Sequence, residues 1–320
     1  MVSTNITKIY FRGNEIVALY KGDTLIFMKS PGVYKIKGTV NPYSGEQSIQ
    51  LCVNGKQEQF NVNSDNTFEH TFVNVPVTNM NYFTQPCRDK LKTLDLSEFD
   101  TSKVTSMIEA FYQCSNLTSI DLTNIDTSNV TDMHQMFNSC TNLKSLDVRN
   151  FDTSKVTDMN YMFYNCFYLT SLDLSNFDTS NVTQMGHMFR GCKNLKSLDL
   201  SNFDTSKVTR LQYMFYDDEK LTDLYINFDV RSIKDDNYNY NGIFYKCSSL
   251  KNVVGKFEGA KINLDLSYCP LTADSAMVFI NGLATVTEKR TLYLSATTYD
   301  SLTPEQIAIA TSKGWTVTRN

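Results

Sequence analysis

Residues 143–168 read LKSLDVRNFDTSKVTDMNYMFYNCFY, and this 26-residue pattern recurs along more than half of the chain. Four apolar columns keep the 26-residue spacing without a gap. They are formed by Leu91, Leu117, Leu143, Leu169, Leu195 and Leu221, by Leu94, Ile120, Leu146, Leu172, Leu198 and Leu224, by Leu96, Leu122, Val148, Leu174, Leu200 and Ile226, and by Phe99, Ile125, Phe151, Phe177 and Phe203. This register excludes chance and makes internal repetition the feature that decides the fold.

Each unit contains two patterns. Alternation at Leu143, Leu146 and Val148 predicts a short strand with one buried face. The second half of the unit has the apolar spacing of one face of a short helix, at Val156, Met159, Met162, Phe163 and Cys166. The FDTS segment between them predicts a turn. One unit cannot bury both faces, so the units must stack. The fold class predicted is α+β, a leucine-rich-repeat solenoid of strand–turn–helix units after a small all-β N-terminal region.

The flanking segments divide the chain into four regions. Residues 1–30 read as three β runs separated by Gly turns, and residues 31–76 predict a small β-sandwich-like module with a hairpin at Asn54-Gly55. The solenoid is assigned to 77–258, with a degenerate half-unit at 77–90 and an insertion at 235–242. Residues 259–320 are assigned to its C-terminal cap.

The cap has its own signals. Residues 272–284 predict a helix, and TLYLSA predicts a strand. Thr303, Pro304 and Gln306 form a helix start with a capping pair. Trp315, the only tryptophan, is expected to seal the core of the last coil.

Composition excludes several classes of protein. The formal net charge of −4 argues against a nucleic-acid partner, and no apolar stretch approaches the length of a membrane span. The N-terminal sequence MVSTNITKIYFRGNE lacks the pattern of a secretory leader, so we expect no export by such a leader. No Ser nucleophile elbow, zinc-protease motif or P-loop is present, so the sequence predicts no enzyme, no cofactor and no metal site.

One column of the repeat consists of cysteines, namely Cys87, Cys114, Cys140, Cys166, Cys192 and Cys247. Stacked thiols could in principle form disulfides. The favoured interpretation is a column of buried, small apolar residues, because there is no C-x-x-C pair.

A second column is acidic. It consists of Asp95, Asp121, Asp147, Asp173 and Asp199, between inward-facing leucines, and should therefore face outward. Carboxylates about 5 Å apart repel by roughly 1 kcal/mol in water, so they need compensation. Lysines alternate with Thr or Asn in two nearby columns, at Lys92, Lys144 and Lys196 and at Lys103, Lys155 and Lys207. The column is either a charge-balanced, solvated face or an acidic strip for a cation or a basic partner.

The same two-unit alternation appears among aromatic residues. Tyr112, Tyr164 and Tyr216 alternate with Asn138 and Arg190 in one column, and Tyr161 and Tyr213 lie nearby. Tyrosines spaced on one surface would suit a glycan or protein partner, because they offer apolar area with a polar tip. The alternative is half-buried packing around the helical face.

The string SLDLSNFDTSNVTQMGHMFRGCKNL at 171–195 resembles the BspA-like leucine-rich-repeat proteins of bacterial surfaces, including mycoplasma lipoprotein repeats of unknown function. That resemblance implies a non-catalytic adhesion or interaction role. The segments ITKIYFRGNEIVALYKGDTLIF and LTADSAMVFINGLATVTEKRTLYL resemble the ends of structural and tail-associated proteins of phages of gut bacteria.

Two hypotheses for function follow. The first is a non-catalytic virion protein, assembled in the host cytoplasm. Its residues 1–30 would contact other virion proteins, and its solenoid would bind a bacterial surface glycan or protein, with a homo-oligomer left open. The alternative is an adhesin on a bacterial cell surface.

Overall fold

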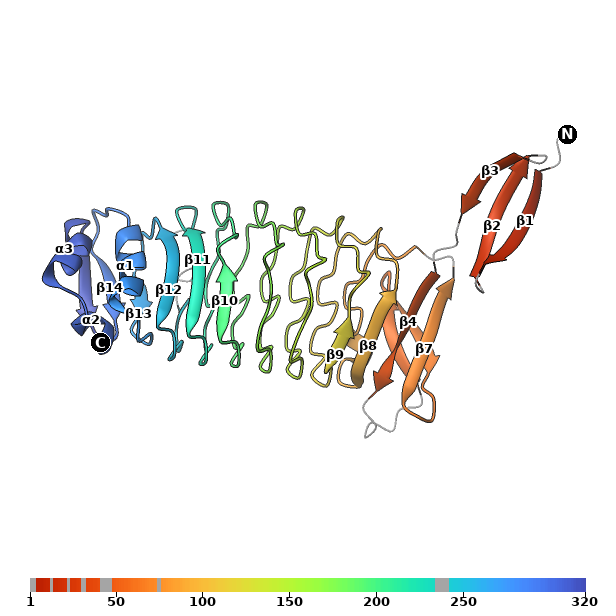
Figure 1. The fold of residues 1–320 in the computed structure, drawn as a ribbon, viewed down its shortest axis with the longest axis horizontal. Coiled ribbons are helices and arrows are strands. Elements are labelled where there is room, and N and C mark those ends of the chain that lie inside the picture. Colours follow the sequence, from red (N-terminus) through yellow and green to blue (C-terminus); the bar gives the residue numbers. More distant parts are fainter. Residues whose placement is uncertain are drawn as a thin grey trace.

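The computed structural model describes residues 4–11, 14–21, 24–29, 33–40, 48–73, 76–233 and 242–320. Figure 1 shows the 26-residue units following one another as coils along the long axis, and we call residues 76–233 and 242–258 the coil stack. Every member of the four apolar columns is buried, except the half-buried Ile120. The predicted inward direction of these columns is therefore confirmed.

The strands of the coil stack form parallel ladders at its two ends. β8 (Leu91–Glu98) pairs with β9 (Ser119–Asp121), and β10 (Ser197–Leu200) pairs with β11 (Asp223–Asp229), which pairs with β12 (Asn252–Glu258). The equivalent residues of the two middle coils, 145–148 and 171–174, form no strand. We call this side of the coil stack the strand face. The described residues form no β-ladder in its middle.

The prediction of a helix in the second half of each unit is wrong. No residue of 156–166 is helical: 160–165 form turns, and Asp158 makes isolated parallel bridges to Asp132 and Gln184. Tyr161 and Asn165 have φ angles of 58° and 55°, a left-handed conformation that a right-handed helix cannot contain. Backbone amides that a helix would use internally bond to the next coil instead, as where Phe163 N donates to Met188 O at 2.9 Å. We call this side the turn face.

Buried threonines also join consecutive coils. The Thr153 hydroxyl donates to Asp178 O at 2.9 Å and accepts from Asp178 N at 2.9 Å. The side chain of Thr153 is only 1% exposed, so this pair of bonds is shielded from water. Thr101, Thr127 and Thr205 make the same two bonds to the following coil. The FDTS turn therefore connects units as well as reversing the chain.

The N-terminal β region extends the strand face. β4 (Val33–Val40) lies between β7 (Thr67–Val73) and β8 and is antiparallel to both. A Cβ atom on Gly38 would lie 2.3 Å from Thr93 O, so this close pairing requires glycine. β4 and β7 thus share one sheet with β8 and β9, whereas β5 and β6 pair in a sheet of their own. The small β-sandwich-like module at 31–76 stays a prediction.

Two further predicted β features are confirmed. β5 (Ser48–Val53) and β6 (Lys56–Asn61) form the hairpin at Asn54-Gly55, with φ angles of 51° and 74° at the two turn residues. β1 (Thr4–Phe11), β2 (Asn14–Lys21) and β3 (Thr24–Lys29) form an antiparallel meander.

The C-terminal cap contains true helices. β13 (Leu264–Leu266), β14 (Arg290–Leu294) and β15 (Trp315–Arg319) form a parallel sheet, connected through α1 (Ala273–Gly282), α2 (Ala296–Asp300) and α3 (Pro304–Ser312). The capping box of Thr303 and Gln306 is present, as predicted. Trp315 is buried, and its Nε1 donates to Ala284 O at 2.8 Å.

Two short features complete the fold. A 3-10 helix, η2 (Gln85–Cys87), lies in the half-unit that precedes β8. The insertion predicted at 235–242 lies outside the described residues, except for Gly242.

Replacing Thr153 by valine should lower the free energy of unfolding by about 2 kcal/mol, because it leaves two backbone groups of Asp178 without partners. Urea unfolding monitored by circular dichroism measures this change. Thr170→Val is the control, because exposed Thr170 makes a single long bond, to Lys144 O at 3.3 Å. Equal stabilities of the two variants would contradict the role of the buried threonines.

Candidate functional site

The predicted acidic column faces outward from the strand face. Asp121, Asp147, Asp173 and Asp199 are exposed, and Asp95 is half-buried beside Lys37, whose Nζ lies 2.9 Å from its carboxylate. The outward direction of the column is therefore confirmed.

Local hydrogen bonds compensate these carboxylates. Asp173 Oδ1 accepts from Ser175 N at 3.1 Å and from Ser175 Oγ at 2.7 Å, which lowers the pKa of Asp173. The Arg149 guanidinium and amide lower the pKa of Asp147 to about 2. Among the described ion pairs, none joins the five aspartates to the column of Lys92, Lys144 and Lys196.

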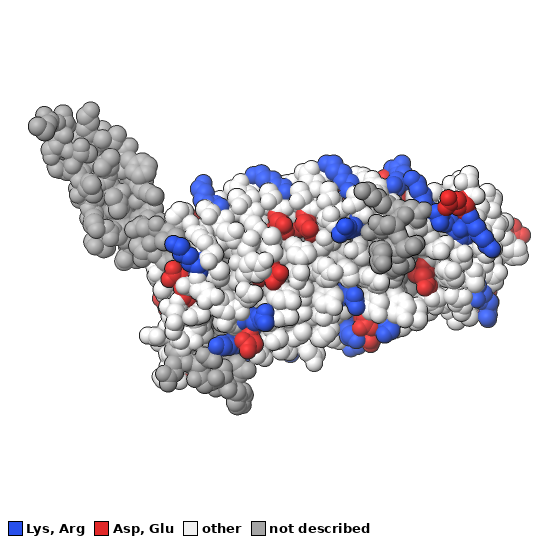
Figure 2. All heavy atoms as spheres, turned by 180° about the vertical axis from the view of Figure 1, so that it is seen from behind, with Lys and Arg blue, Asp and Glu red and all other residues white. Residues whose placement is uncertain are grey.

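The alternation of lysine with asparagine in the other column has a direct explanation. Lys155 Nζ donates to Asn129 Oδ1 at 2.8 Å, and Lys207 Nζ donates to Asn181 Oδ1 at 3.0 Å. Lys155 and Lys207 thus each bond to an uncharged partner one coil away, and neither stacks on another lysine. On the face seen in Figure 2, basic and acidic side chains are interspersed, and Lys and Arg follow its upper edge.

The turn face carries a continuous group of aromatic rings. Tyr161 stacks on His187 with centroids 4.3 Å apart, and His187 lies 5.0 Å from Tyr213. We define the aromatic row by all the rings in this series together with one arginine: His134, Tyr161, Tyr164, His187, Arg190, Tyr213, Tyr216, Tyr245 and Tyr268. The row therefore runs across several consecutive coils.

Arg190 is the centre of the aromatic row. Its guanidinium carbon lies 4.3 Å from the ring centroid of Tyr216, 5.4 Å from that of Tyr213 and 5.5 Å from that of Tyr164. A cation over aromatic faces is attracted by the ring quadrupoles. Of the tyrosines predicted as a surface, Tyr164, Tyr213 and Tyr216 are thus brought together around Arg190, and Tyr161 joins them through Tyr164 and His187. These four rings are all half-buried.

Tyr112 does not belong to this group. Its neighbours are Arg88, 6.0 Å from its ring centroid, and Gln113, whose side chain donates to its hydroxyl at 3.1 Å. Asn138 occupies the intervening position of the column, and it has no aromatic ring to continue the row. The structure therefore separates Tyr112 from the other predicted tyrosines.

Two histidines of the aromatic row were missed by the sequence interpretation. His187 lies 26 residues after Tyr161 and 26 before Tyr213, so the repeat register contained the signal that could have found it. Burial, assisted by Arg190, lowers the pKa of His187 to about 4, and its ring is therefore neutral at pH 7. In contrast, the Asp158 carboxylate, 3.6 Å from Nδ1, raises the pKa of His134.

The cysteine column is buried, and all its thiols are free. The thiols of Cys140, Cys166 and Cys192 bond to phenylalanine carbonyls of the preceding coil at 3.1 to 3.2 Å. The interpretation as small buried residues is therefore confirmed.

One position of the cysteine column holds an acid. Asp218 lies 26 residues after Cys192 and is 0% exposed. Its Oδ1 accepts from Cys192 N at 2.7 Å, whereas its Oδ2 has no hydrogen-bond partner in the described part of the chain. Burial raises the pKa of Asp218 well above its ordinary range. The folded chain therefore favours the protonated acid at this position.

The described residues contain no group of three or more His, Cys, Asp or Glu side chains arranged to hold a metal ion. The helices that the structure describes are also too short or too polar to cross a bilayer.

Replacing Asp218 by asparagine should stabilise the protein increasingly as the pH rises from 4 to 7. Above a pKa near 4 the unfolded wild-type acid has lost its proton, whereas the folded acid with its raised pKa retains it. Wild-type stability then falls by up to about 1.4 kcal/mol per pH unit, until the folded pKa is reached.

Urea unfolding of Asp218→Asn and wild type at several pH values measures this difference. Asp218→Cys, which restores the residue of the column, should show the same trend. A difference that does not change between pH 4 and pH 7 would refute the assignment of a protonated acid.

Replacing Arg190 by asparagine, the residue at the equivalent position 138, should lower the free energy of unfolding by about 1 kcal/mol. The loss reflects the contacts of the guanidinium with three tyrosine rings. Denaturant unfolding measures it. The control is Arg210→Gln, which replaces an exposed arginine by the residue at the equivalent position 184. If the two variants were equally stable, Arg190 would not be an organising residue.

Comparison with known proteins identifies the repeat. Neither the search of curated proteins nor the search of solved structures gave a match. A family model described as "Mycoplasma protein of unknown function, DUF285" matches residues 78–173 and 167–268. Together the two matches cover more than half of the chain and nearly all of the coil stack. The chain therefore belongs to this repeat family, which is related to the BspA-like proteins.

Proposed function

We propose that this chain is a non-catalytic structural and binding protein of a bacteriophage virion. In this proposal the coil stack is a solenoid of the leucine-rich-repeat type. Residues 1–30 attach to other virion proteins, and the solenoid binds a glycan or protein of the bacterial surface.

The observation that carries the proposal of binding is the aromatic row. Tyrosine and arginine are the residue types that contribute most to binding energy at protein surfaces. In the aromatic row they are held in place by one another and by a backbone bonded to the next coil. A surface fixed before binding loses little conformational entropy when a partner docks.

The acidic column supports binding over catalysis. A glycosidase needs two carboxylates whose environments differ, so that one is protonated and the other is charged. Asp121, Asp173 and Asp199 instead repeat one arrangement, in which Oδ1 accepts from the amide two residues later. Repetition of this kind gives none of these three carboxylates the distinct environment that a catalytic acid needs.

The assignment to a virion rests on the resemblance of residues 6–27 and of the C-terminal cap to structural and tail-associated proteins of phages. Mass spectrometry tests it, on phage particles purified from the lysate of a host whose phage or prophage encodes this chain. We expect the protein at stoichiometric abundance in the particles. Its absence from intact particles, while it is present in the lysate, would reject the virion assignment.

A second candidate, an adhesin on a bacterial cell surface, is favoured by membership of a family described from Mycoplasma. Protease treatment of intact cells followed by mass spectrometry separates the two proposals. Release of peptides from the coil stack would favour the adhesin, and complete protection of the protein on intact cells would exclude it.

A further inference from the structure

We propose that a pocket in the strand face, between the coils that contain β9 and Arg149, binds a neutral sugar unit of a bacterial surface glycan. This inference rests on the proposed binding function and goes beyond it, because it adds a ligand site on the strand face, separate from the aromatic row of the turn face, and names the class of ligand.

The pocket exists because the parallel ladder stops at β9. The following coil has no strand at 145–148, and the backbone amides of these four residues have no described hydrogen-bond partner. The opening has a volume of about 500 Å³, within the range of small-ligand sites. Two coils further along, the smaller opening at Asp173 and Asp199 has about 160 Å³.

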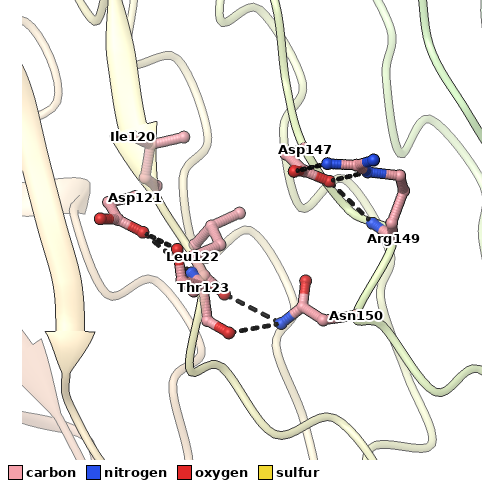
Figure 3. A pocket seen from close by; sticks show the side chains of 7 residues that line it. All are labelled: Ile120, Asp121, Leu122, Thr123, Asp147, Arg149 and Asn150. Atoms are coloured by element: carbon pink, nitrogen blue, oxygen red, sulfur yellow. Dashed lines mark hydrogen bonds and ion pairs between the residues drawn. The ribbon is translucent and has the colours of Figure 1, made fainter.

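Polar side chains from two coils surround this pocket. Figure 3 shows Asn150 between Asp121 and Thr123 of one coil and the pair of Asp147 and Arg149 of the next. Asn150 Nδ2 donates to Leu122 O at 2.9 Å, which fixes the side chain, whereas its Oδ1 has no partner among the described residues. Asp121 likewise uses only Oδ1 in its described hydrogen bonds. Both side chains therefore keep acceptor atoms for a ligand.

Arg149 is a departure from the repeat. The equivalent positions hold Ser97, Thr123, Ser175 and Ser201, which bond to the aspartate two residues earlier. A short hydroxyl residue is thus sufficient for the fold at this position. Arg149 Nε and Nη2 bond to Asp147 at 2.9 and 2.7 Å, while its side chain remains 67% exposed. The pocket therefore displays a planar ion pair that stacking of the coils does not require.

The chemistry of the lining fits an uncharged polyol. Sugar hydroxyls both donate and accept hydrogen bonds. The lining offers acceptors on Asp121 and Asn150 and donors on Arg149, and half-buried Ile120 provides apolar surface for ring C–H groups. Two carboxylates and one guanidinium give the lining a net charge of −1, which disfavours uronates, sialic acids and phosphates.

Isothermal titration with purified neutral hexose oligosaccharides and with uronate oligosaccharides tests the proposal. We expect the full-length protein to bind a neutral oligosaccharide and Arg149→Ser to bind it about tenfold more weakly, through loss of charge-assisted hydrogen bonds. Arg231→Ser is the matched control. Arg231 bonds to Asp229 two residues earlier in the same way, is 66% exposed, and does not line this pocket.

Each outcome has a defined meaning. No binding of any neutral oligosaccharide at millimolar concentration, a preference for uronates, or equal affinities of Arg149→Ser and wild type would each overturn the pocket assignment. Adsorption of the labelled protein to host cells is measured in parallel. Adsorption that persists without oligosaccharide binding overturns the pocket alone, whereas a wild-type protein that binds neither cells nor sugars contradicts the proposed function as well.

Discussion

The structure depends on hydrogen bonding between coils at a fixed offset of one repeat. On the turn face, backbone amides donate to carbonyls of the next coil, as Phe163 N does to Met188 O. At the neighbouring turn, the buried hydroxyl of Thr153 satisfies both backbone groups of Asp178. In the regular units each of these bonds spans 25 residues, so a constant unit length keeps them in register. The coil that contains the insertion keeps the equivalent bond across 28 residues, from Phe215 N to Ile243 O. Leucine, methionine and phenylalanine columns then stack on their own kind in one core.

The same constraint explains why polar groups alternate along the coil stack. Identical charges in one column would lie about 5 Å apart and repel. Lysine therefore alternates with asparagine, and each aspartate of the strand face is bound by its own turn. The polar surface residues are thus compatible with the coil above and the coil below.

Positions that depart from the repeat are therefore informative. Asp218 replaces a cysteine in the core, and Arg149 replaces a small hydroxyl residue on the strand face. Arg190 stands where Asn138 or a tyrosine occurs in other units, and it draws several rings into one cluster. Stacking alone does not require these residues. Each gives its unit a feature that the regular units lack: a buried acid at Asp218, an exposed ion pair at Arg149 and a cation against three rings at Arg190.

The sequence alone determined the repeat length, the inward-facing columns, the Asn54-Gly55 hairpin and the capped helix at Thr303, because each follows from local periodicity or turn chemistry. It also predicted two neighbouring columns, one of Tyr164, Arg190 and Tyr216 and one of Tyr161 and Tyr213, without deciding between an exposed surface and half-buried packing. Only the tertiary structure decided that 156–166 contains turns and no helix. The same apolar spacing suits a helix or a turn-rich coil, and the choice depends on whether amides bond within the coil or to the next one. Tertiary structure likewise decided the opening beside Arg149 and the pairing of β4 with β8, because both depend on backbone distances between segments that no local pattern encodes.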